Sequence, residues 1–211
     1  MKTKALFITF EGVDGSGKST QLQLLKDSLE VAGQAVLTVR EPGGTAAGEA
    51  IRQILLDPAQ VGLEPVAELM LFAAARAQLT AEVIRPALQA KTIVLCDRFI
   101  DSTVAYQGYG RGLDTGRLNR LNEWATGGLT PDLTFLLDLD PTRGQERIRT
   151  GRKAAKDRME EAESSFFDRV AKGYRELARK APQRFCVLDA GQTVATIEEQ
   201  IKNRVREELE K

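Results

Sequence analysis

The sequence predicts a doubly wound α/β sandwich, in which helices cover both faces of a parallel β-sheet. Short apolar segments of strand length alternate with longer segments of helical periodicity, and this strand–helix repeat favours parallel strands. The run Thr92–Cys96 is almost continuously apolar, as buried parallel strands are. With 211 residues, 42% of them hydrophobic, the chain has the size and composition of one globular domain. We therefore expect a single domain over residues 1–211.

Five apolar runs of strand length are predicted strands because they lack helical periodicity and are flanked by polar or turn-forming residues. In chain order they are Ala5–Phe10, Ala35–Val39, Thr92–Cys96, Leu133–Leu139 and Arg184–Leu188. Between and after them, apolar residues recur at helical spacing, with recognisable start and stop signals. The predicted helices are Lys18–Ala32, Thr45–Leu56, Pro65–Ala90, Thr115–Thr126, Pro141–Thr150, Ser164–Ala181 and Thr193–Glu210.

Charge and hydropathy argue against two classes of partner. Lys plus Arg and Asp plus Glu are equal at 30 each, so the balance does not suggest a surface that attracts DNA or RNA. No apolar run approaches the ~18–20 residues that span a bilayer. The segment Met1–Lys4 leads into a strand-like run without a plausible cleavage site. We expect a soluble, cytoplasmic protein whose partners include neither nucleic acid nor membrane.

Cysteine and histidine content limits the available chemistry. Cys96 and Cys186 each lie in an apolar run, far apart and without metal-site spacing, so we expect both to be reduced core residues. The chain has no histidine, which removes the commonest general base and metal ligand. Any chemistry must then use carboxylates, lysine, arginine and backbone amides, with or without a bound cation.

The strongest motif is a complete G-x-x-x-x-G-K-[ST] between the first strand and the first helix. Its glycines let backbone N–H groups face phosphate oxygens, and the helix N-terminus favours negative charge. Lys18 is expected to reach the β- and γ-phosphates, and Ser19 to offer its hydroxyl to Mg²⁺. The motif alone does not separate kinases from GTPases, ATPases or passive nucleotide binders. The expected ATP-binding residues are Gly12, Val13, Asp14, Gly15, Ser16, Gly17, Lys18, Ser19 and Thr20.

A second charged pair, Asp97-Arg98, follows the strand Thr92–Cys96. Open α/β sheets bind ligands at the carboxyl ends of their strands, so Asp97 is a candidate for orienting Mg²⁺ or its waters. Arg98 can hold an acceptor phosphate with two parallel hydrogen bonds. The alternative is a surface ion pair that caps the strand.

Two further segments suggest where an acceptor could lie. The Pro-Gly-Gly turn within Arg40–Thr45 allows close backbone approach to a ligand, although it could equally be only a tight connection. Phe72 and Arg76 are spaced i, i+4 and so share one helix face in an apolar run. Phe72 could stack on a base while Arg76 binds its carbonyl. Alternatively, Phe72 is a core residue and Arg76 extends to solvent.

These motifs together resemble the thymidylate kinase family of P-loop nucleoside monophosphate kinases. The resemblance rests on Phe10–Thr20, Arg40–Thr45, Leu71–Arg76, Asp97–Phe99 and Ser102–Gly108, which occur in the family's order over most of the chain. It implies a P-loop NTPase fold with strand order 2-3-1-4-5. It also implies Mg²⁺-dependent transfer of the ATP γ-phosphoryl group to dTMP, giving dTDP and ADP, and commonly a homodimer.

The resemblance implies roles for individual residues. Lys18, Asp97 and Arg98 would be catalytic, and Ser19 and Asp97 would bind the metal. Asp14 would contact the deoxyribose 3′-hydroxyl, and Tyr106 would crowd a 2′-hydroxyl and so disfavour ribonucleotides. The expected substrate-binding residues are Asp14, Glu41, Phe72, Arg76, Arg98, Thr103, Tyr106 and Gln107.

The family places its transition-state arginine either in the P-loop or in a lid. This P-loop has Gly15-Ser16 and no arginine, so the charged stretch at about 147–163 resembles the lid that supplies it. Arg152 and Arg158 are the leading catalytic candidates there. By composition alone, that stretch would be a solvated helical connection.

Two rival functions remain at the level of sequence. Another P-loop kinase of the same architecture would give no reason for Phe72, Arg76 and Tyr106 to occur together. The other rival is a non-catalytic ATP- or GTP-binding switch; proteins that recognise guanine usually carry an Asn-Lys-x-Asp-type base motif, and the sequence has none.

Overall fold

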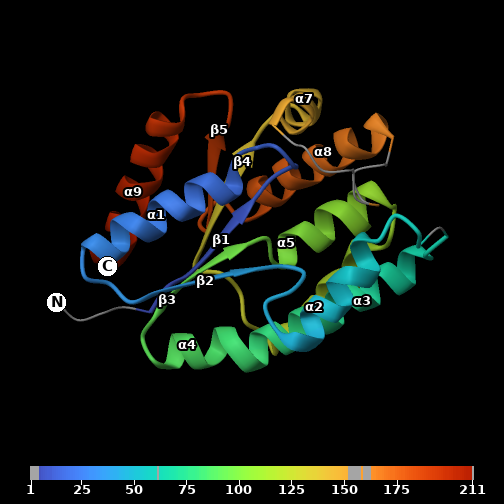
Figure 1. The fold of residues 1–211 in the computed structure, drawn as a ribbon, viewed down its shortest axis with the longest axis horizontal. Helices are drawn as coiled ribbons and strands as arrows, with labels where there is room; N and C mark the ends of the chain where they lie inside the picture. The colour runs from blue at the N-terminus through green and yellow to red at the C-terminus, as the bar shows by residue number, and fades with distance from the viewer. Residues whose placement is uncertain (1–4, 61, 152–157, 159–162, 211) are drawn as a thin grey trace.

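Five parallel strands form the sheet at the centre of the molecule (Figure 1). The computed structural model describes residues 5–60, 62–151, 158 and 163–210. The order β2-β3-β1-β4-β5 confirms the predicted topology. The strands are β1 (Phe7–Glu11), β2 (Val36–Arg40), β3 (Ile93–Asp97), β4 (Leu133–Asp138) and β5 (Phe185–Asp189).

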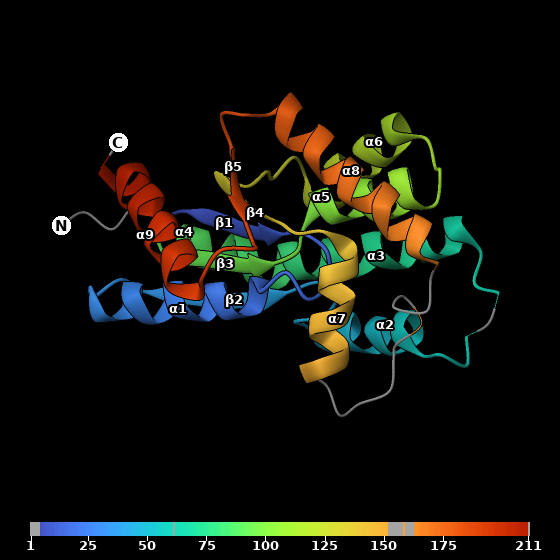
Figure 2. The same cartoon turned by 90° about the horizontal axis from the view of Figure 1, so that it is seen from above.

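Helices cover both faces of the sheet (Figures 1 and 2). On one face, α1 packs beside α9 over the side chains of Ile8 and Phe10. On the other face, Leu79 and Ile84 pack against strand residues that include Phe7. The helical segments are α1 (Lys18–Val31), α2 (Ala46–Leu56), α3 (Pro65–Leu79), η1 (Thr80–Ile84), α4 (Arg85–Gln89), α5 (Ile100–Thr103), η2 (Val104–Gly110), α6 (Thr115–Thr126), α7 (Pro141–Gly151), α8 (Ser164–Lys180) and α9 (Val194–Glu210).

Four of the five strands end on a charged residue just beyond the apolar run that predicted them. β1 ends at Glu11, β2 at Arg40, β3 at Asp97 and β5 at Asp189. The apolar run marks the buried length of each strand, and the last hydrogen-bonded residue already belongs to the polar edge. Charged side chains from neighbouring strands are thereby brought to one edge of the sheet.

The long helix predicted over Pro65–Ala90 is interrupted by the wider π-helical turn η1. The N–H of Arg85 bonds to the carbonyl of Thr80, five residues back. Pro86 follows directly, has no N–H to donate, and crowds the preceding turn of an α-helix. A widened turn accommodates this proline, so the chain continues in the same direction without breaking.

A helical segment at Ile100–Gly110, comprising α5 and η2, was not expected from the sequence. Its β-branched residues and glycines are poor helix formers. Most of its side chains are buried, so it also lacks the polar face that gives a surface helix its periodicity. Packing against α8 and α6 therefore determines its conformation.

The two cysteines and the lengths of the helices bear on the remaining expectations. Cys96 is buried in β3, whereas Cys186 is only partly buried and packs at the edge of the core. Within the described ranges, none of the helices is long and apolar enough to cross a membrane.

Candidate functional site

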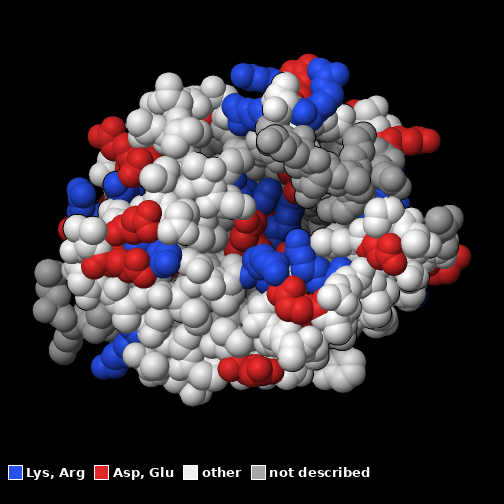
Figure 3. Space-filling model, in the orientation of Figure 1, with Lys and Arg blue, Asp and Glu red and all other residues white. Residues whose placement is uncertain are grey.

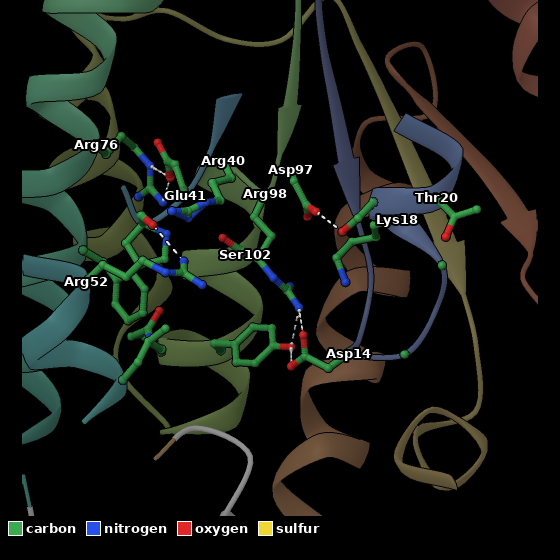
Figure 4. A pocket seen from close by; sticks show the side chains of 18 residues that line it. Asp14, Lys18, Thr20, Arg40, Glu41, Arg52, Arg76, Asp97, Arg98 and Ser102 are labelled. Atoms are coloured by element: carbon green, nitrogen blue, oxygen red, sulfur yellow. Dashed lines mark hydrogen bonds and ion pairs between the residues drawn. The ribbon is translucent and has the colours of Figure 1, made fainter. Parts of the chain in front are cut away.

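A cavity of about 530 Å³ lies at the carboxyl ends of β1, β2 and β3. Figure 3 shows it as a central hollow in which basic and acidic side chains lie together. It runs from the P-loop to the face of α3 that carries Phe72 and Arg76 (Figure 4). The lining residues are Asp14, Gly15, Gly17, Lys18, Ser19, Thr20, Arg40, Glu41, Pro42, Arg52, Leu56, Phe72, Arg76, Asp97, Arg98, Ser102, Tyr106 and Gln107.

The P-loop occupies the turn between β1 and α1 that the motif predicted. Gly12, Gly15 and Gly17 all have positive φ, and a Cβ at Gly12 would lie 2.5 Å from the carbonyl oxygen of Leu137 on β4. The Lys18 ammonium donates to the carbonyl of Val13 at 3.0 Å, so it is held inside the loop. Burial lowers the pKa of Lys18, and the charge of Arg98 lowers it further.

Helix α7 presses directly on the outside of the P-loop. A Cβ on Gly15 would stand 2.3 Å from the carbonyl oxygen of Gly144, and a Cβ on Gly144 would stand 2.4 Å from that of Asp14. Real Cβ atoms essentially never come closer than 3.0 Å, so neither glycine can gain a side chain unless the backbone shifts. Arg147 secures the same contact by donating to the carbonyls of Gly15, at 3.4 Å, and Ala190, at 3.0 Å.

Ser19 and Asp97, the predicted metal-binding residues, meet at the end of the cavity next to α1. The Ser19 hydroxyl donates to a carboxylate oxygen of Asp97 at 2.6 Å (Figure 4). Both contribute hard oxygen atoms beside the P-loop, and Mg²⁺ usually takes one or two such protein ligands together with phosphates and water. The residues present therefore fit Mg²⁺.

Arg98 stands at the centre of the cavity in a strained backbone conformation. Its φ is 70°, which is uncommon for a residue with a Cβ and is typical of functional sites. Its N–H bonds to the carbonyl of Phe10 at 3.0 Å, which holds the turn in place. Figure 4 shows its side chain pointing toward Asp14, with a hydrogen bond of 2.7 Å.

The charge on Asp14 is stabilised by its basic neighbours. Burial alone would raise the pKa of Asp14, but Arg98 and Lys18 together lower it to about 2. The carboxylate is consequently ionised at neutral pH. Tyr106 donates its hydroxyl to the other Asp14 oxygen at 3.3 Å.

The Arg76 guanidinium is fully buried, and protein groups occupy all five of its N–H donors. Nε and Nη2 donate to one carboxylate oxygen of Glu41 at 2.8 and 2.5 Å, and Nη2 also donates to the carbonyl of Phe99. Nη1 donates to Thr103 and Asn122. Burial raises the pKa of Glu41 although Arg76 opposes the shift, and no hydrogen bond from the described residues reaches the second, buried oxygen of this carboxylate. Arg76 thus neither extends to solvent nor lies unpaired.

The other expected substrate residues divide into two groups. Phe72, Tyr106 and Gln107 line the cavity, as do Glu41 and Arg76. Thr103 is only 1% exposed and lies outside the lining, with its hydroxyl accepting a hydrogen bond from Arg76 at 2.7 Å.

Of the two candidate lid arginines, the structure describes only one. Arg152 lies outside the described residues. Arg158 is described and does not line the cavity: it donates to Glu68 at 2.7 Å and to the carbonyl of Leu55 at 2.9 Å. A contact between Arg158 and a nucleotide phosphate would require this side chain to leave Glu68.

Several important residues were not singled out by the sequence analysis. Arg40, Pro42 and Ser102 lie inside the segments that carried the resemblance, so their proximity to the site was available in principle. Arg52 projects from α2 and donates to the carbonyl of Pro42 at 2.8 Å. Glu11 and Tyr174, which lie behind Arg98, are 163 positions apart, and no local pattern relates them.

The cavity combines a P-loop, an Asp-Arg pair at the end of a strand, and a further part lined by aromatic and arginine side chains. This combination defines a P-loop protein that holds a nucleoside triphosphate beside another ligand. Comparison with known proteins identifies the group within this class. The chain belongs to the thymidylate kinase family, since the family model described as thymidylate kinase matches residues 10–201. The family resemblance found in the sequence is therefore confirmed.

Individual relatives agree over nearly the full length. The chain is 48% identical over 205 residues to a thymidylate kinase of Exiguobacterium sp., covering 97% of this chain and 96% of the relative. It is 49% identical to that of Deinococcus radiodurans, covering 97% and 98%. A crystal structure of thymidylate kinase from Ehrlichia chaffeensis superposes with a TM-score of 0.77 at 35% identity, covering 96% of this chain and 99% of that one.

Proposed function

We propose that this protein transfers the γ-phosphoryl group of ATP to dTMP, producing dTDP and ADP for dTTP synthesis. One observation carries the proposal: a single cavity joins Lys18 and Ser19 of the P-loop to Phe72 and Arg76 on α3, with Arg98 between them. A donor phosphate at the P-loop and an acceptor nucleotide beneath α3 would place both reacting groups beside Arg98. In-line transfer requires this arrangement.

The donor side supplies charge and orientation. Backbone N–H groups of the P-loop and the start of α1 hold the phosphates, and Lys18 turns from the Val13 carbonyl toward them. Ser19 would bind Mg²⁺ directly, and Asp97 would bind it directly or through its waters. When bound, the ion neutralises charge that develops on the phosphate oxygens.

The acceptor side would recognise the base, the sugar and the phosphate separately. Phe72 stacks on thymine, and Arg76, fixed by Glu41, Thr103 and Asn122, reaches its carbonyl by sharing one of the N–H groups that these partners hold. Asp14 accepts a hydrogen bond from the 3′-hydroxyl, and Tyr106 fills the space that a 2′-hydroxyl needs. Gln107 completes the wall.

A nucleotide panel tests the proposed substrate. With Mg²⁺ and ATP, the purified protein should convert dTMP to dTDP with a higher kcat/KM than for dCMP, UMP, AMP or GMP. Coupled detection of ADP and chromatography of the products provide the measurement. Equal or better use of any of the other four nucleotides would overturn the assignment.

Part of the catalytic charge is proposed to come from the lid. Arg152 or Arg158 would stabilise the transferring phosphoryl group, because the P-loop carries no arginine at Gly15-Ser16. At least one of the variants Arg152→Ala and Arg158→Ala should lose kcat strongly while its affinity for dTMP changes little. Unchanged kcat in both variants would exclude the lid arginines.

We further propose that residues 1–211 act as one domain and that the protein is a cytoplasmic homodimer. Exposed apolar side chains on two adjoining helices, Val66 and Met70 on α3 and Trp124 on α6, support a subunit contact there. Sedimentation equilibrium should give twice the chain mass. A monomer at micromolar concentration would contradict the dimer.

A further inference from the structure

Behind Arg98 lies a buried chain of hydrogen bonds that the proposed reaction does not itself use. The hydroxyl of Tyr174, on α8, accepts a hydrogen bond from Arg98 Nη1 at 3.0 Å. The same hydroxyl donates to a carboxylate oxygen of Glu11 at 2.8 Å. Glu11 is 0% exposed and also accepts the N–H of Phe99 at 2.7 Å, while Tyr174 is 1% exposed.

The direction of these bonds is fixed by chemistry. A phenol hydroxyl has a single proton, so when Tyr174 gives it to Glu11, only lone pairs remain to face Arg98. A guanidinium has no acceptor, so the hydroxyl accepts from Arg98 in either protonation state of Glu11, and the ionised carboxylate, by taking the phenol proton, holds it in that orientation. A charge-assisted bond from a guanidinium to such an acceptor is strong where water is excluded.

The arrangement has a counterpart on the other side of the guanidinium. Arg98 Nη2 donates to the hydroxyl of Tyr106 at 3.1 Å, and Tyr106 in turn donates to Asp14. The rings of Tyr106 and Tyr174 pack edge to face with centroids 6.3 Å apart. Arg98 is therefore gripped by two tyrosine hydroxyls, and a buried carboxylate orients the one from Tyr174.

We infer that Tyr174 is a positioning residue: held by Glu11, its hydroxyl fixes the Arg98 guanidinium toward the acceptor phosphate. This inference rests on the proposed role of Arg98 in binding the dTMP phosphate. Tyr174 acts on the substrate only through Arg98, because its hydroxyl lies on the buried side of the guanidinium and does not line the cavity.

Tyr174→Phe tests the inference, since it removes the hydroxyl and keeps the ring. We expect its affinity for dTMP to fall about tenfold, while its affinity for thymidine, which lacks the phosphate, stays within twofold. Titration calorimetry with each ligand provides both values. An equal loss of affinity for both ligands, or no loss for either, would overturn the inference.

Tyr109→Phe is a matched control. It also removes a hydroxyl from a ring packed between η2 and α8, where the Tyr109 ring lies against Gly173. Arg98 donates to Gly12, Asp14, Tyr106 and Tyr174 within the described residues. We therefore expect wild-type affinity for both ligands in this control, and a phosphate-specific loss in it would contradict the role of Tyr174.

A double-mutant cycle separates action through Arg98 from a general structural effect. In an Arg98→Ala background, Tyr174→Phe should produce no further loss of dTMP affinity, because contacting residues that act as one unit are not additive. Additive losses would reject the inference. A wild-type protein that binds dTMP but does not phosphorylate it would instead contradict the proposed function. The double-mutant cycle measures only binding, so it would still test the role of Tyr174.

Discussion

Individual charged residues in this protein are held in place by its own groups. Arg76 makes five hydrogen bonds to four protein acceptors, and Arg98 contacts Gly12, Asp14 and two tyrosine hydroxyls. Such preorganisation reduces the rearrangement needed when phosphate charge develops during the reaction. It also makes the site sensitive to the loss of a single partner, because the remaining charge stays buried.

The buried pair of Arg76 and Glu41 leads to a stability prediction. Arg76→Met should lower the free energy of unfolding by about 3–5 kcal/mol, since it leaves the Glu41 carboxylate buried without its cation. Urea denaturation measures this loss. The double variant Arg76→Met/Glu41→Gln should recover part of it, and a double variant less stable than Arg76→Met would contradict this account.

A pH prediction follows from Glu11. Burial, reinforced by the charge of Asp101, raises the pKa of Glu11 from 4.5 to about 8, although Arg98, the Phe99 N–H and Tyr174 pull it down. Between those pH values the folded state binds more protons than the unfolded state. The free energy of unfolding contributed by this group therefore falls as pH rises from 4.5 to 8, by at most about 1.4 kcal/mol per pH unit.

Glu11→Gln should remove that contribution. Its free energy of unfolding, relative to wild type, should increase steadily between pH 5 and pH 8 in urea denaturation. Glu176→Gln, on the exposed side of α8 beside Arg179, is the control and should show no such trend. A constant difference between Glu11→Gln and wild type across the range would mean that Glu11 does not titrate there.

Secondary-structure elements place these residues. The sequence predicted most of these elements, but it missed one helical segment and one contact between elements. The apolar runs and the P-loop predicted all five strands and most helices, because burial and helical periodicity are local signals. Ile100–Gly110 escaped because packing, and not propensity, makes it helical. The partnership of Tyr174 with Glu11 also escaped, since it arises from α8 crossing the end of β1 and leaves no trace in either segment.

The contact between α7 and the P-loop gives a prediction about an element. Gly144→Ala should lower kcat/KM for both ATP and dTMP at least tenfold, because its Cβ must displace the backbone of Asp14. Steady-state kinetics with each substrate varied in turn measures this effect.

Gly116→Ala, in α6, is the matched control for that variant. Its Cβ would meet two side-chain atoms and no backbone, the Asp114 oxygen at 3.2 Å and Arg120 Nη1 at 3.9 Å, and alanine favours a helix over glycine by about 1 kcal/mol. Activity should be unchanged in this control. Wild-type kinetics for Gly144→Ala would show that α7 moves aside without consequence for the site.

At the scale of the whole molecule, the strand order of the sheet brings the P-loop next to the end of β3. The neighbours of β1 are β3 and β4, so the P-loop lies beside Asp97 and Arg98 of the β3 end. The family resemblance supplied this order, whereas strand count alone would have left many arrangements open. The groups that satisfy Arg76 come from three separate segments, which carry Glu41, Phe99 with Thr103, and Asn122, and this could be learned only from the three-dimensional structure.

Ligand binding should stabilise the whole fold. At a concentration 100 times its Kd, dTMP should add about 2.7 kcal/mol to the free energy of unfolding, which corresponds to a Tm increase of roughly 5–10 °C for a chain of this size. Scanning calorimetry measures the shift. Lys18→Ala should keep the dTMP shift, reduce the shift given by Mg²⁺ and ATP, and abolish turnover; a loss of both shifts would indicate misfolding.

The contact between Gly15 and Gly144 has an evolutionary consequence. An arginine at position 15 cannot be accommodated by that substitution alone, since the space for its Cβ is already filled by the backbone of α7. Helix α7 would have to withdraw first, and Arg147 would lose its bond to the Gly15 carbonyl as it did so. The backbone of α7 is thus a barrier to an arginine at position 15, and under the proposed role of the lid a descendant of this protein would still take its catalytic arginine from outside the P-loop.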